Sequence, residues 1–159
     1  YKVLGVRSHG KGCFISRIVK GRELKKTLKY RPVKSDSLFW CKVDTKSGGF
    51  GIITNEYADC VVTSNMATAR INTQLVLSKY FNLIISSNDF ETMVANASAG
   101  STNRKYLTPI DLLEKVYIPL PSITEQKKIV GKYDEINELR NSLEKEDAIL
   151  QKIILNLWH

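Results

Sequence analysis

The strongest constraint on the fold of this sequence is an apolar residue repeated at every seventh position near its C-terminal end. The repeat begins at Ile129 and continues without interruption through Ile136, Leu143, Leu150 and Leu157. A seven-residue period places these side chains in one stripe along an α-helix, as in a coiled coil. A second stripe is formed by Tyr133, Leu139, Ile153 and Ile154, and it is weaker because Glu146 and Asp147 interrupt it.

The start of this helix is predicted near residue 122. Ser122 and Thr124 compete as its N-cap, and Glu125 suits the positive end of the helix dipole. A helix of about 35 residues is roughly 52 Å long, which exceeds the width of a domain formed by the rest of the chain. We therefore expect the apolar stripe to pair with a helix of a second copy or of another chain. The alternative is a helix folded back on its own domain.

Two prolines, Pro119 and Pro121, separate this helix from the preceding part of the chain. We predict a globular domain over 1–121 and a pairing helix over 122–159. In the globular part, short runs rich in Val, Ile, Phe and Tyr alternate with turn residues. This pattern indicates an α+β domain with a curled, mostly antiparallel sheet and short helices.

The positions of these elements follow from the apolar periodicity and from cap residues. Strands are predicted at 1–7, 13–19, 38–43, 50–54, 60–64, 67–71 and 116–119. Helices are predicted at 73–85, at 88–97 and from Pro109, after a Thr108 cap. Ser87 or Asn88 is expected to cap the second helix, with Glu91 placed for a capping box.

The positive charge of the chain is confined to its first third. Residues 1–50 contain 13 Lys or Arg and 3 Asp or Glu, a net charge of +10. Residues 51–123 and residues 124–159 each have a net charge of −1. A polyanion is the natural partner for such a segment, and a solvated basic face is the alternative.

The cysteines and apolar runs restrict the compartment and the metal chemistry. Cys13, Cys41 and Cys60 are scattered and odd in number, which argues against a disulfide framework and favours a reducing compartment such as the cytoplasm. His9 lies four residues before Cys13, but no second pair follows, so we predict buried or partly buried thiols and no metal site. No apolar run approaches the roughly 18 residues that span a bilayer, so no membrane partner is predicted.

Motifs for catalysis are missing from the sequence. There is no phosphate-binding glycine loop and no Gly-x-Ser-x-Gly turn. The four prolines are never adjacent, which excludes the Asn/Asp-Pro-Pro-Tyr/Phe turn of adenine methyltransferases. Acid-x-Lys triplets of magnesium nucleases occur at Glu23 and Glu125, but the first has no upstream acid and the second starts a helix. We therefore predict no catalytic residues and a protein that is not an enzyme.

Two glycine-containing loops offer side chains for recognition instead. The first places two cations, a hydroxyl and an imidazole around Gly10 and Gly12, and the second follows Gly100. Glycine lets such a loop approach a base edge or a phosphate closely, and Arg and Lys can donate to guanine or to phosphate. Together with the basic segment, the loops favour double-stranded DNA as partner. The candidate DNA-binding residues are Arg7, Ser8, His9, Lys11, Ser101, Thr102, Arg104 and Lys105.

A family resemblance is carried by the segment 116–130. Its sequence, Val-Tyr-Ile-Pro-Leu-Pro-Ser-Ile-Thr-Glu-Gln-Lys-Lys-Ile-Val, resembles the end of a target-recognition domain in the specificity subunits of type I restriction-modification systems. The loop 100–107 and the segments 6–12 and 48–51 resemble other parts of these domains. The resemblance covers essentially the whole chain, and the Pro-Leu-Pro and Glu-Gln block is its specific part.

The resemblance implies a function that the residue pattern alone does not give. The globular domain is expected to read one half of a bipartite DNA site, and the long helix to pack antiparallel with a second helix that sets the distance between the halves. Methyltransferase subunits are expected to dock beside it and to carry S-adenosylmethionine and the catalysis. A complete subunit has two recognition domains and two helices, so the chain is a fragment, a half-subunit that homodimerises, or the specificity tail of a fused restriction-methylation enzyme. A protein-interaction scaffold acting through the helix is the competing hypothesis, and a nuclease is a third.

Overall fold

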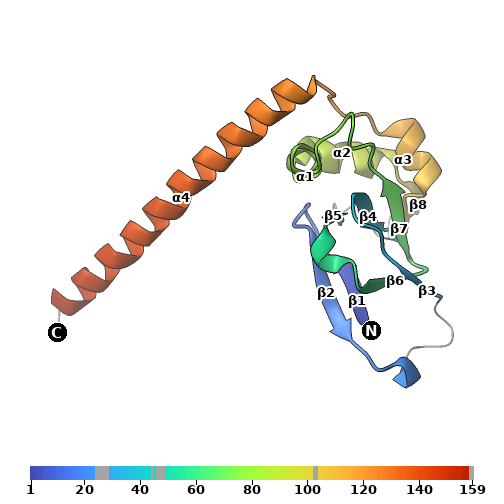
Figure 1. The fold of residues 1–159 in the computed structure, drawn as a ribbon, viewed down its shortest axis with the longest axis horizontal. Helices are drawn as coiled ribbons and strands as arrows, with labels where there is room; N and C mark the ends of the chain where they lie inside the picture. Colours follow the sequence, from blue (N-terminus) through green and yellow to red (C-terminus); the bar gives the residue numbers. More distant parts are fainter. Residues whose placement is uncertain (24–28, 44, 46–48, 102–103, 158–159) are drawn as a thin grey trace. The chain divides into compact units, whose positions relative to one another are not determined.

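The computed structural model describes residues 1–23, 29–43, 45, 49–101 and 104–157. The chain divides into two compact units, Tyr1–Leu120 and Pro121–His159 (Figure 1). The first unit is α+β, as predicted, and its strands are β1 (Lys2–Val6), β2 (Cys13–Ile18), β3 (Tyr30–Pro32), β4 (Ser37–Cys41), β5 (Phe50–Ile53), β6 (Cys60–Thr63), β7 (Met66–Arg70), β8 (Ala99–Ser101) and β9 (Arg104–Tyr106). Its helices are α1 (Ser78–Ile85), α2 (Asn88–Ala97) and α3 (Pro109–Lys115), with short 3-10 turns η1 (Gly21–Glu23) and η3 (Asn55–Tyr57).

The strands are divided between two sheets and a hairpin rather than joined in one. The first sheet has the order β2-β1-β6-β3, the second has the order β5-β4-β7, and β8 pairs with β9. Every pairing is antiparallel except that of β1 with β6, so the predicted antiparallel character is confirmed. Strand β3 was not expected, because Pro32 argues against a central strand. It is tolerated here because β3 is the edge of its sheet.

The three-stranded sheet is buried on both faces, which explains the unbroken apolar runs of β4 and β5. On one face, Phe39 joins a core with residues of the four-stranded sheet: Leu4, Cys13, Val33, Ile53, Cys60 and Val62. On the other face, Trp40 stacks on Phe50 with ring centroids 6.0 Å apart, and Phe50 meets Phe90 of α2 edge-to-face at 5.1 Å. Helices α1, α2 and α3 lie against this face (Figure 1). The indole of Trp40 donates to the carbonyl oxygen of Leu107, so this core has no unpaired indole.

The first helix begins later than its apolar periodicity predicts. Residues 73–75 form a turn, at whose start the Asn72 side chain accepts a hydrogen bond from the backbone N–H of Gln74. This side-chain bond stabilises an Asx turn, which competes with helix formation. Helix α1 therefore starts at Ser78 instead of residue 73, although it ends as predicted at Ile85.

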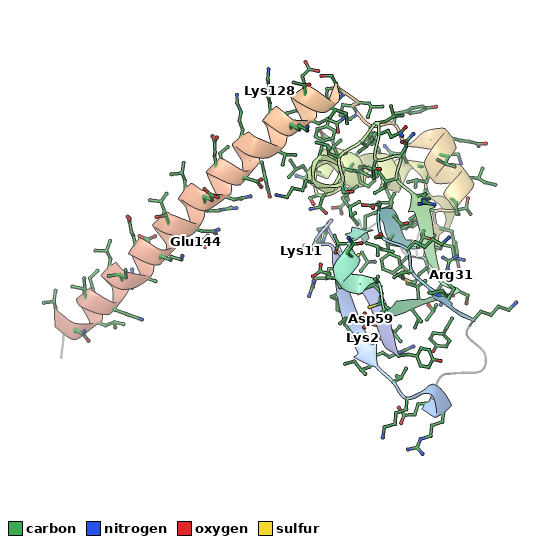
Figure 2. The ribbon with its side chains drawn as sticks, viewed as in Figure 1. Lys2, Lys11, Arg31, Asp59, Lys128 and Glu144 are labelled. Atoms are coloured by element: carbon green, nitrogen blue, oxygen red, sulfur yellow. The ribbon has the colours of Figure 1, made fainter. Side chains whose placement is uncertain are left out.

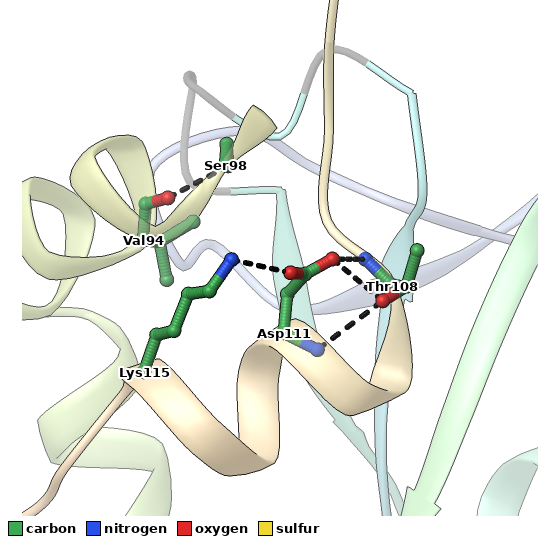
Figure 3. Close-up of polar contacts among 5 residues, drawn as sticks. All are labelled: Val94, Ser98, Thr108, Asp111 and Lys115. Carbon is green, nitrogen blue, oxygen red and sulfur yellow. Dashed lines mark hydrogen bonds and ion pairs between the residues drawn. The ribbon is translucent and has the colours of Figure 1, made fainter. Parts of the chain in front are cut away.

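Helix α3 starts with the predicted Thr108 cap and Pro109 (Figure 3). The Thr108 hydroxyl accepts from the backbone N–H of Asp111 at 3.2 Å, and the Asp111 carboxylate accepts from the backbone N–H of Thr108 at 3.3 Å. Lys115 donates to the same carboxylate at 2.6 Å. The predicted strand at 116–119 is wrong: the segment after α3 has no strand partner.

The second unit is a single 35-residue helix, α4 (Ile123–Leu157), as predicted. Ser122 is its N-cap rather than Thr124. The Ser122 hydroxyl accepts from the backbone N–H of Glu125 at 3.3 Å, and the Glu125 carboxylate accepts from the backbone N–H of Ser122 at 3.0 Å. Gln126 then donates its amide to the carbonyl oxygen of Pro121. The side chains of Glu125 and Gln126 therefore both bond to the backbone just before α4 and cap its first turn.

The apolar stripe of α4 lies in solvent. Its five heptad residues, Ile129, Ile136, Leu143, Leu150 and Leu157, are between 43% and 78% exposed. Packing of such a stripe is what stabilises a long helix in water, since propensity alone leaves isolated helices marginal. Among the described residues, none of the helices combines the length and apolar character required to cross a membrane.

Candidate nucleic-acid interface

The first candidate loop is a tight turn between β1 and β2. The backbone N–H of Arg7 donates to the carbonyl oxygen of Gly12 at 2.9 Å, which closes the turn. His9, Gly10 and Gly12 have positive φ angles of 57°, 61° and 79°. Such backbone angles favour glycine, and they explain why the sequence has two glycines here. Ser8 and Lys11 are exposed on the turn.

Gly10 holds this turn against the junction between α1 and α2. The hydroxyl of Ser86 donates to the carbonyl oxygen of Gly10 at 3.0 Å. A Cβ atom on residue 10 would lie 2.4 Å from the carbonyl oxygen of Ile85 and 2.5 Å from the Cα atom of Ser86. The two backbones therefore approach so closely that only glycine fits, and the turn is fixed to the helices rather than free in solvent.

His9 is bound to the same helix pair through its side chain. Its Nδ1 atom lies 3.0 Å from Oε2 of Glu91 on α2. Glu91 does not form the predicted capping box. Ser87 is the N-cap of α2 and accepts from the backbone N–H of Phe90, which leaves the Glu91 carboxylate available to His9. Of the first-loop candidates, His9 is thus already paired within the protein.

Arg7 is oriented by two neighbours, Cys13 and Phe14. Its Nη1 atom donates to the carbonyl oxygen of Cys13 at 3.2 Å, an oxygen that also accepts from the hydroxyl of Tyr57. The guanidinium carbon lies 4.7 Å from the centre of the Phe14 ring, within the range of a cation–π contact. The hydrogen bond uses Nη1 alone, and no other hydrogen bond of this guanidinium group occurs among the described residues, so its remaining N–H groups are available to a ligand.

The described residues of the second candidate loop include the paired strands β8 and β9. Ser101 pairs with Arg104 in the backbone register, and Val43 forms an isolated bridge with Tyr106. The backbone N–H of Leu107 donates to the carbonyl oxygen of Lys42, so the hairpin is attached beyond the end of β4. Thr102 and the side chains of Ser101, Arg104 and Lys105 lie outside the described part of the structure. The sequence predicted a loop here, and strand pairing across it was missed.

The basic residues of the first third do not gather at one point. Lys11 and Arg31 lie on opposite sides of the first unit in Figure 2. Lys2 is neutralised by Asp59, whose carboxylate lies 2.7 Å from its ammonium group. That contact raises the pKa of Lys2 and lowers the pKa of Asp59. Of the described cations, Arg17 and Arg31 lie on the edge strands β2 and β3, and Arg7 and Lys11 lie at the turn between β1 and β2, so the positive charge is spread over several elements.

The cysteines match the predicted burial. All three are free thiols, of which Cys13 and Cys60 are buried and Cys41 is partly buried. Burial raises the pKa of Cys13 to about 12, and its Sγ atom donates to the carbonyl oxygen of Ile52. His9 is exposed and Cys13 is buried, so these two do not face a common site. No cluster of three or more metal-ligating side chains occurs among the described residues.

An apolar cleft of about 220 Å³ lies between β7 and the three helices of the first unit. Apolar side chains of these elements, including Leu38, Val76 and Phe90, form most of its lining. Arg70 and Asn72 are the polar residues that line it. Every buried side-chain nitrogen and oxygen in the described residues has a hydrogen-bond partner, so this cleft has no orphaned polar group that points to a ligand.

Comparison with solved structures identifies the fold. The chain superposes on the HsdS subunit from Thermoanaerobacter tengcongensis with a TM-score of 0.70 and 15% identity, over 93% of this chain and 37% of that one. It also matches a chain from a study of complex assembly and conformational transition of the type I R-M system, with a TM-score of 0.63 and 16% identity, over 84% of this chain and 34% of that one. No protein-family model and no curated protein sequence matches. The fold is that of HsdS specificity subunits, and the chain spans about a third of their length.

Proposed function

We propose that this chain is a DNA-specificity module of a type I restriction-modification system. In this role the unit 1–120 reads one half of a bipartite site on double-stranded DNA, and α4 sets the distance to the other half. The observation that carries the proposal is the fold: an HsdS subunit matches 93% of the chain, which includes both the globular unit and helical residues after it. The Pro-Leu-Pro and Glu-Gln block, whose residues cap α4, supports the same assignment.

The DNA contacts are assigned to the two loops. In the first, Arg7, Ser8 and Lys11 are exposed on a turn that Gly10 fixes against the helices. A fixed turn supports sequence reading, because side chains that are ordered before binding lose less conformational entropy on binding. In the second loop, Ser101, Thr102, Arg104 and Lys105 supply donors and acceptors. His9 contributes through the turn, since its ring is bound to Glu91.

The chemistry is assigned to a partner. The module itself is not an enzyme, and a methyltransferase subunit that carries S-adenosylmethionine docks beside it. The complex works in the cytoplasm, where the free thiols Cys13, Cys41 and Cys60 suit a reducing environment. The second recognition domain comes from the rest of a longer chain, from a second copy, or from a fused restriction-methylation enzyme whose specificity tail is this chain.

The proposal is tested by selection from a random pool of DNA duplexes. The chain is assembled with a type I methyltransferase subunit from the same organism, and bound duplexes are sequenced. We expect enrichment of a half-site or of a split site. Binding should weaken steeply with salt, because the cationic side chains of the protein release counterions from the DNA when they bind. Enrichment should be lost for Arg7→Ala combined with Lys11→Ala. A pool without enrichment at any salt concentration argues against the proposal.

A second function is favoured by the exposed stripe of α4. A protein-interaction scaffold would use Ile136, Leu143 and Leu150, each more than half exposed, as its binding surface. Under that hypothesis, changing these three residues to Asp abolishes activity while Arg7 and Arg104 are dispensable. Under the DNA-specificity proposal, both sets of residues are required.

A further inference from the structure

One face of the four-stranded sheet carries Phe14, Arg17 and Tyr30 beside two buried valines, Val3 and Val61. Residues paired across strands share a face of the sheet. The register pairs Arg17 with Val3, Val3 with Val61, and Val61 with Pro32. Two residues further along, Gly5 pairs with Phe14 and Thr63 pairs with Tyr30. We call this surface the outer face, and its members are Val3, Gly5, Phe14, Arg17, Tyr30, Pro32, Val61 and Thr63.

Arg17 and Tyr30 span the outer face from one edge strand to the other. They belong to β2 and β3, which lie at the two ends of the strand order, and the Nη2 atom of Arg17 lies 3.3 Å from the hydroxyl oxygen of Tyr30. On the same face, Val3 and Val61 are only 3% and 9% exposed. The aliphatic stem of Arg17 and the ring of Tyr30 are side chains of the kind that cover apolar surface while their polar ends stay in water.

Arg7 is held on the same face by Phe14. A Cβ atom on Gly5 would lie 3.1 Å from the Phe14 ring, so the missing side chain lets this ring lie directly on the backbone of β1. The Arg7 guanidinium lies over the ring at 4.7 Å. Arg7 is also the first residue of the turn that forms the first candidate loop. The outer face therefore continues into the surface to which DNA reading is assigned.

The two guanidinium groups have the chemistry of an anion site. Among the described residues, no carboxylate lies within salt-bridge distance of Arg7 or Arg17. Each group is oriented by an aromatic residue and keeps free N–H donors. Preordered guanidinium groups match the paired oxygens of a phosphate, and phosphates take at least half of the hydrogen bonds in protein–DNA complexes. The net charge of +10 over residues 1–50 adds a favourable field.

We propose that the outer face binds the phosphodiester backbone of duplex DNA beside the bases that the first loop reads. Arg17 contacts a phosphate, Tyr30 positions the Arg17 guanidinium, and Arg7 joins this backbone contact to the loop. The proposal rests on the function proposed above and adds a surface that carries affinity without sequence preference. Gly5 and Phe14 also contribute to DNA binding under this proposal, because they position the Arg7 guanidinium.

The test measures binding of a dye-labelled duplex of random sequence by fluorescence anisotropy over a series of salt concentrations. The whole chain is used, with Arg17→Met as the variant, since methionine keeps an apolar stem over Val3 and Val61. Loss of one phosphate contact should reduce the slope of log affinity against log salt by about 0.9. Arg17→Lys should keep the slope. Tyr30→Phe should keep the slope and weaken binding about 2- to 10-fold, the effect of one lost hydrogen bond.

Arg70→Met is the matched control. It removes the same charge from β7 in the other sheet, and it should change the slope much less than Arg17→Met does. Equal slopes for wild type and Arg17→Met overturn the proposal, as does an equal effect of Arg70→Met, which would indicate net charge alone. Reduced capture of the methyltransferase subunit by Arg17→Met with unchanged DNA binding also overturns it, because the face would then bind protein.

The salt series and the selection from the random pool together separate the role of the outer face from the proposed function on which it rests. Selection from the random pool with Arg17→Met should return the same enriched sequence as the wild type, at lower yield. If the wild type selects no sequence but its salt slope falls with Arg17→Met, the sequence-reading function fails while the backbone contact stands. If the wild type selects a sequence and its slope is unaffected by Arg17→Met, the outer face fails while the function stands.

Discussion

The hydroxyl of Ser86 donates a hydrogen bond of 3.0 Å to the carbonyl oxygen of Gly10, and this bond joins the β1–β2 turn to the junction between α1 and α2. The two residues are 76 positions apart in the sequence. This contact fixes the turn, which carries several exposed side chains, to helices α1 and α2. The candidate DNA-reading residues around it are thereby presented on a fixed support.

Gly10 and Gly12 provide a matched pair for testing this support. Alanine at either position is strained, since both φ angles are positive, and about 1–2 kcal/mol is expected from that strain alone. A Cβ atom on Gly12 meets nothing within 4 Å, whereas one on Gly10 collides with the backbone of Ile85 and Ser86. Gly10→Ala should therefore lower the free energy of unfolding by about 1–3 kcal/mol more than Gly12→Ala, as overpacking does. Urea unfolding measures both, and equal losses would contradict the close approach.

The His9–Glu91 contact is expected to position the turn rather than to stabilise the fold. Both side chains are partly exposed, so removal of either should change the free energy of unfolding by less than about 1 kcal/mol. His9→Ala, Glu91→Ala and the double variant should weaken binding to the selected DNA by similar factors, with a coupling energy of at least about 0.5 kcal/mol. Asp89→Ala, which removes the same charge from the first turn of α2, is the control.

A stronger complex for Glu91→Ala would contradict this role of His9. In that case the dominant effect of Glu91→Ala would be the removal of a carboxylate that repels phosphate, and His9 would contact DNA directly. The binding assay is the same fluorescence titration used for the outer face, with the selected duplex as probe.

Asp111 gives a prediction for the start of α3. Lys115 first, and then Thr108, hold the pKa of its carboxyl group at about 2, below the ordinary value of 3.8. A folded-state pKa below the unfolded one means that ionised Asp111 stabilises the fold above pH 3.8, and that this contribution is lost as the pH falls toward 2. Carboxyl-detected NMR titration should show a larger rise of this pKa in Lys115→Met than in Thr108→Val. The reverse order would contradict the dominant contact with Lys115.

The elements that could be predicted from the sequence are those specified locally. The seven-residue repeat predicted α4, and the Thr108-Pro109 pair predicted the start of α3, because periodicity and caps are properties of neighbouring residues. Strand β3 and the late start of α1 could not be predicted, since Pro32 is acceptable only on an edge strand and the Asn72 turn competes with a clear helical period. In both cases the tertiary context or a single side chain overrides the local pattern.

The candidate site was predicted in part for the same reason. Gly10 and Gly12 mark the β1–β2 turn and its exposed cations, but the contacts that fix the turn come from Ser86 and Glu91, more than 75 positions away. No local pattern indicates such a contact. The outer face was missed because Arg17 and Tyr30 belong to opposite edges of a sheet whose strand order is not the order of the sequence.

The exposed stripe of α4 is expected to pair two copies of the chain. Burying a leucine side chain contributes about 1.5–3 kcal/mol, so five heptad positions suffice to pair two such helices even with an interrupted second stripe. We expect the whole chain to form dimers as its concentration rises, measured as solution mass by light scattering. Leu143→Asp should abolish them, because it places a charge in the centre of the seam.

Asn141→Asp is the control for that substitution. It adds the same charge two residues earlier, about 200° around the helix from the stripe, and should leave the dimer intact. A chain that stays monomeric at every concentration would contradict self-pairing. Because the chain spans only about a third of the HsdS subunits that it resembles, the partner helix would then be sought in a longer chain. In that case Leu143→Asp should instead lower the stability of the longer chain, and Asn141→Asp should not.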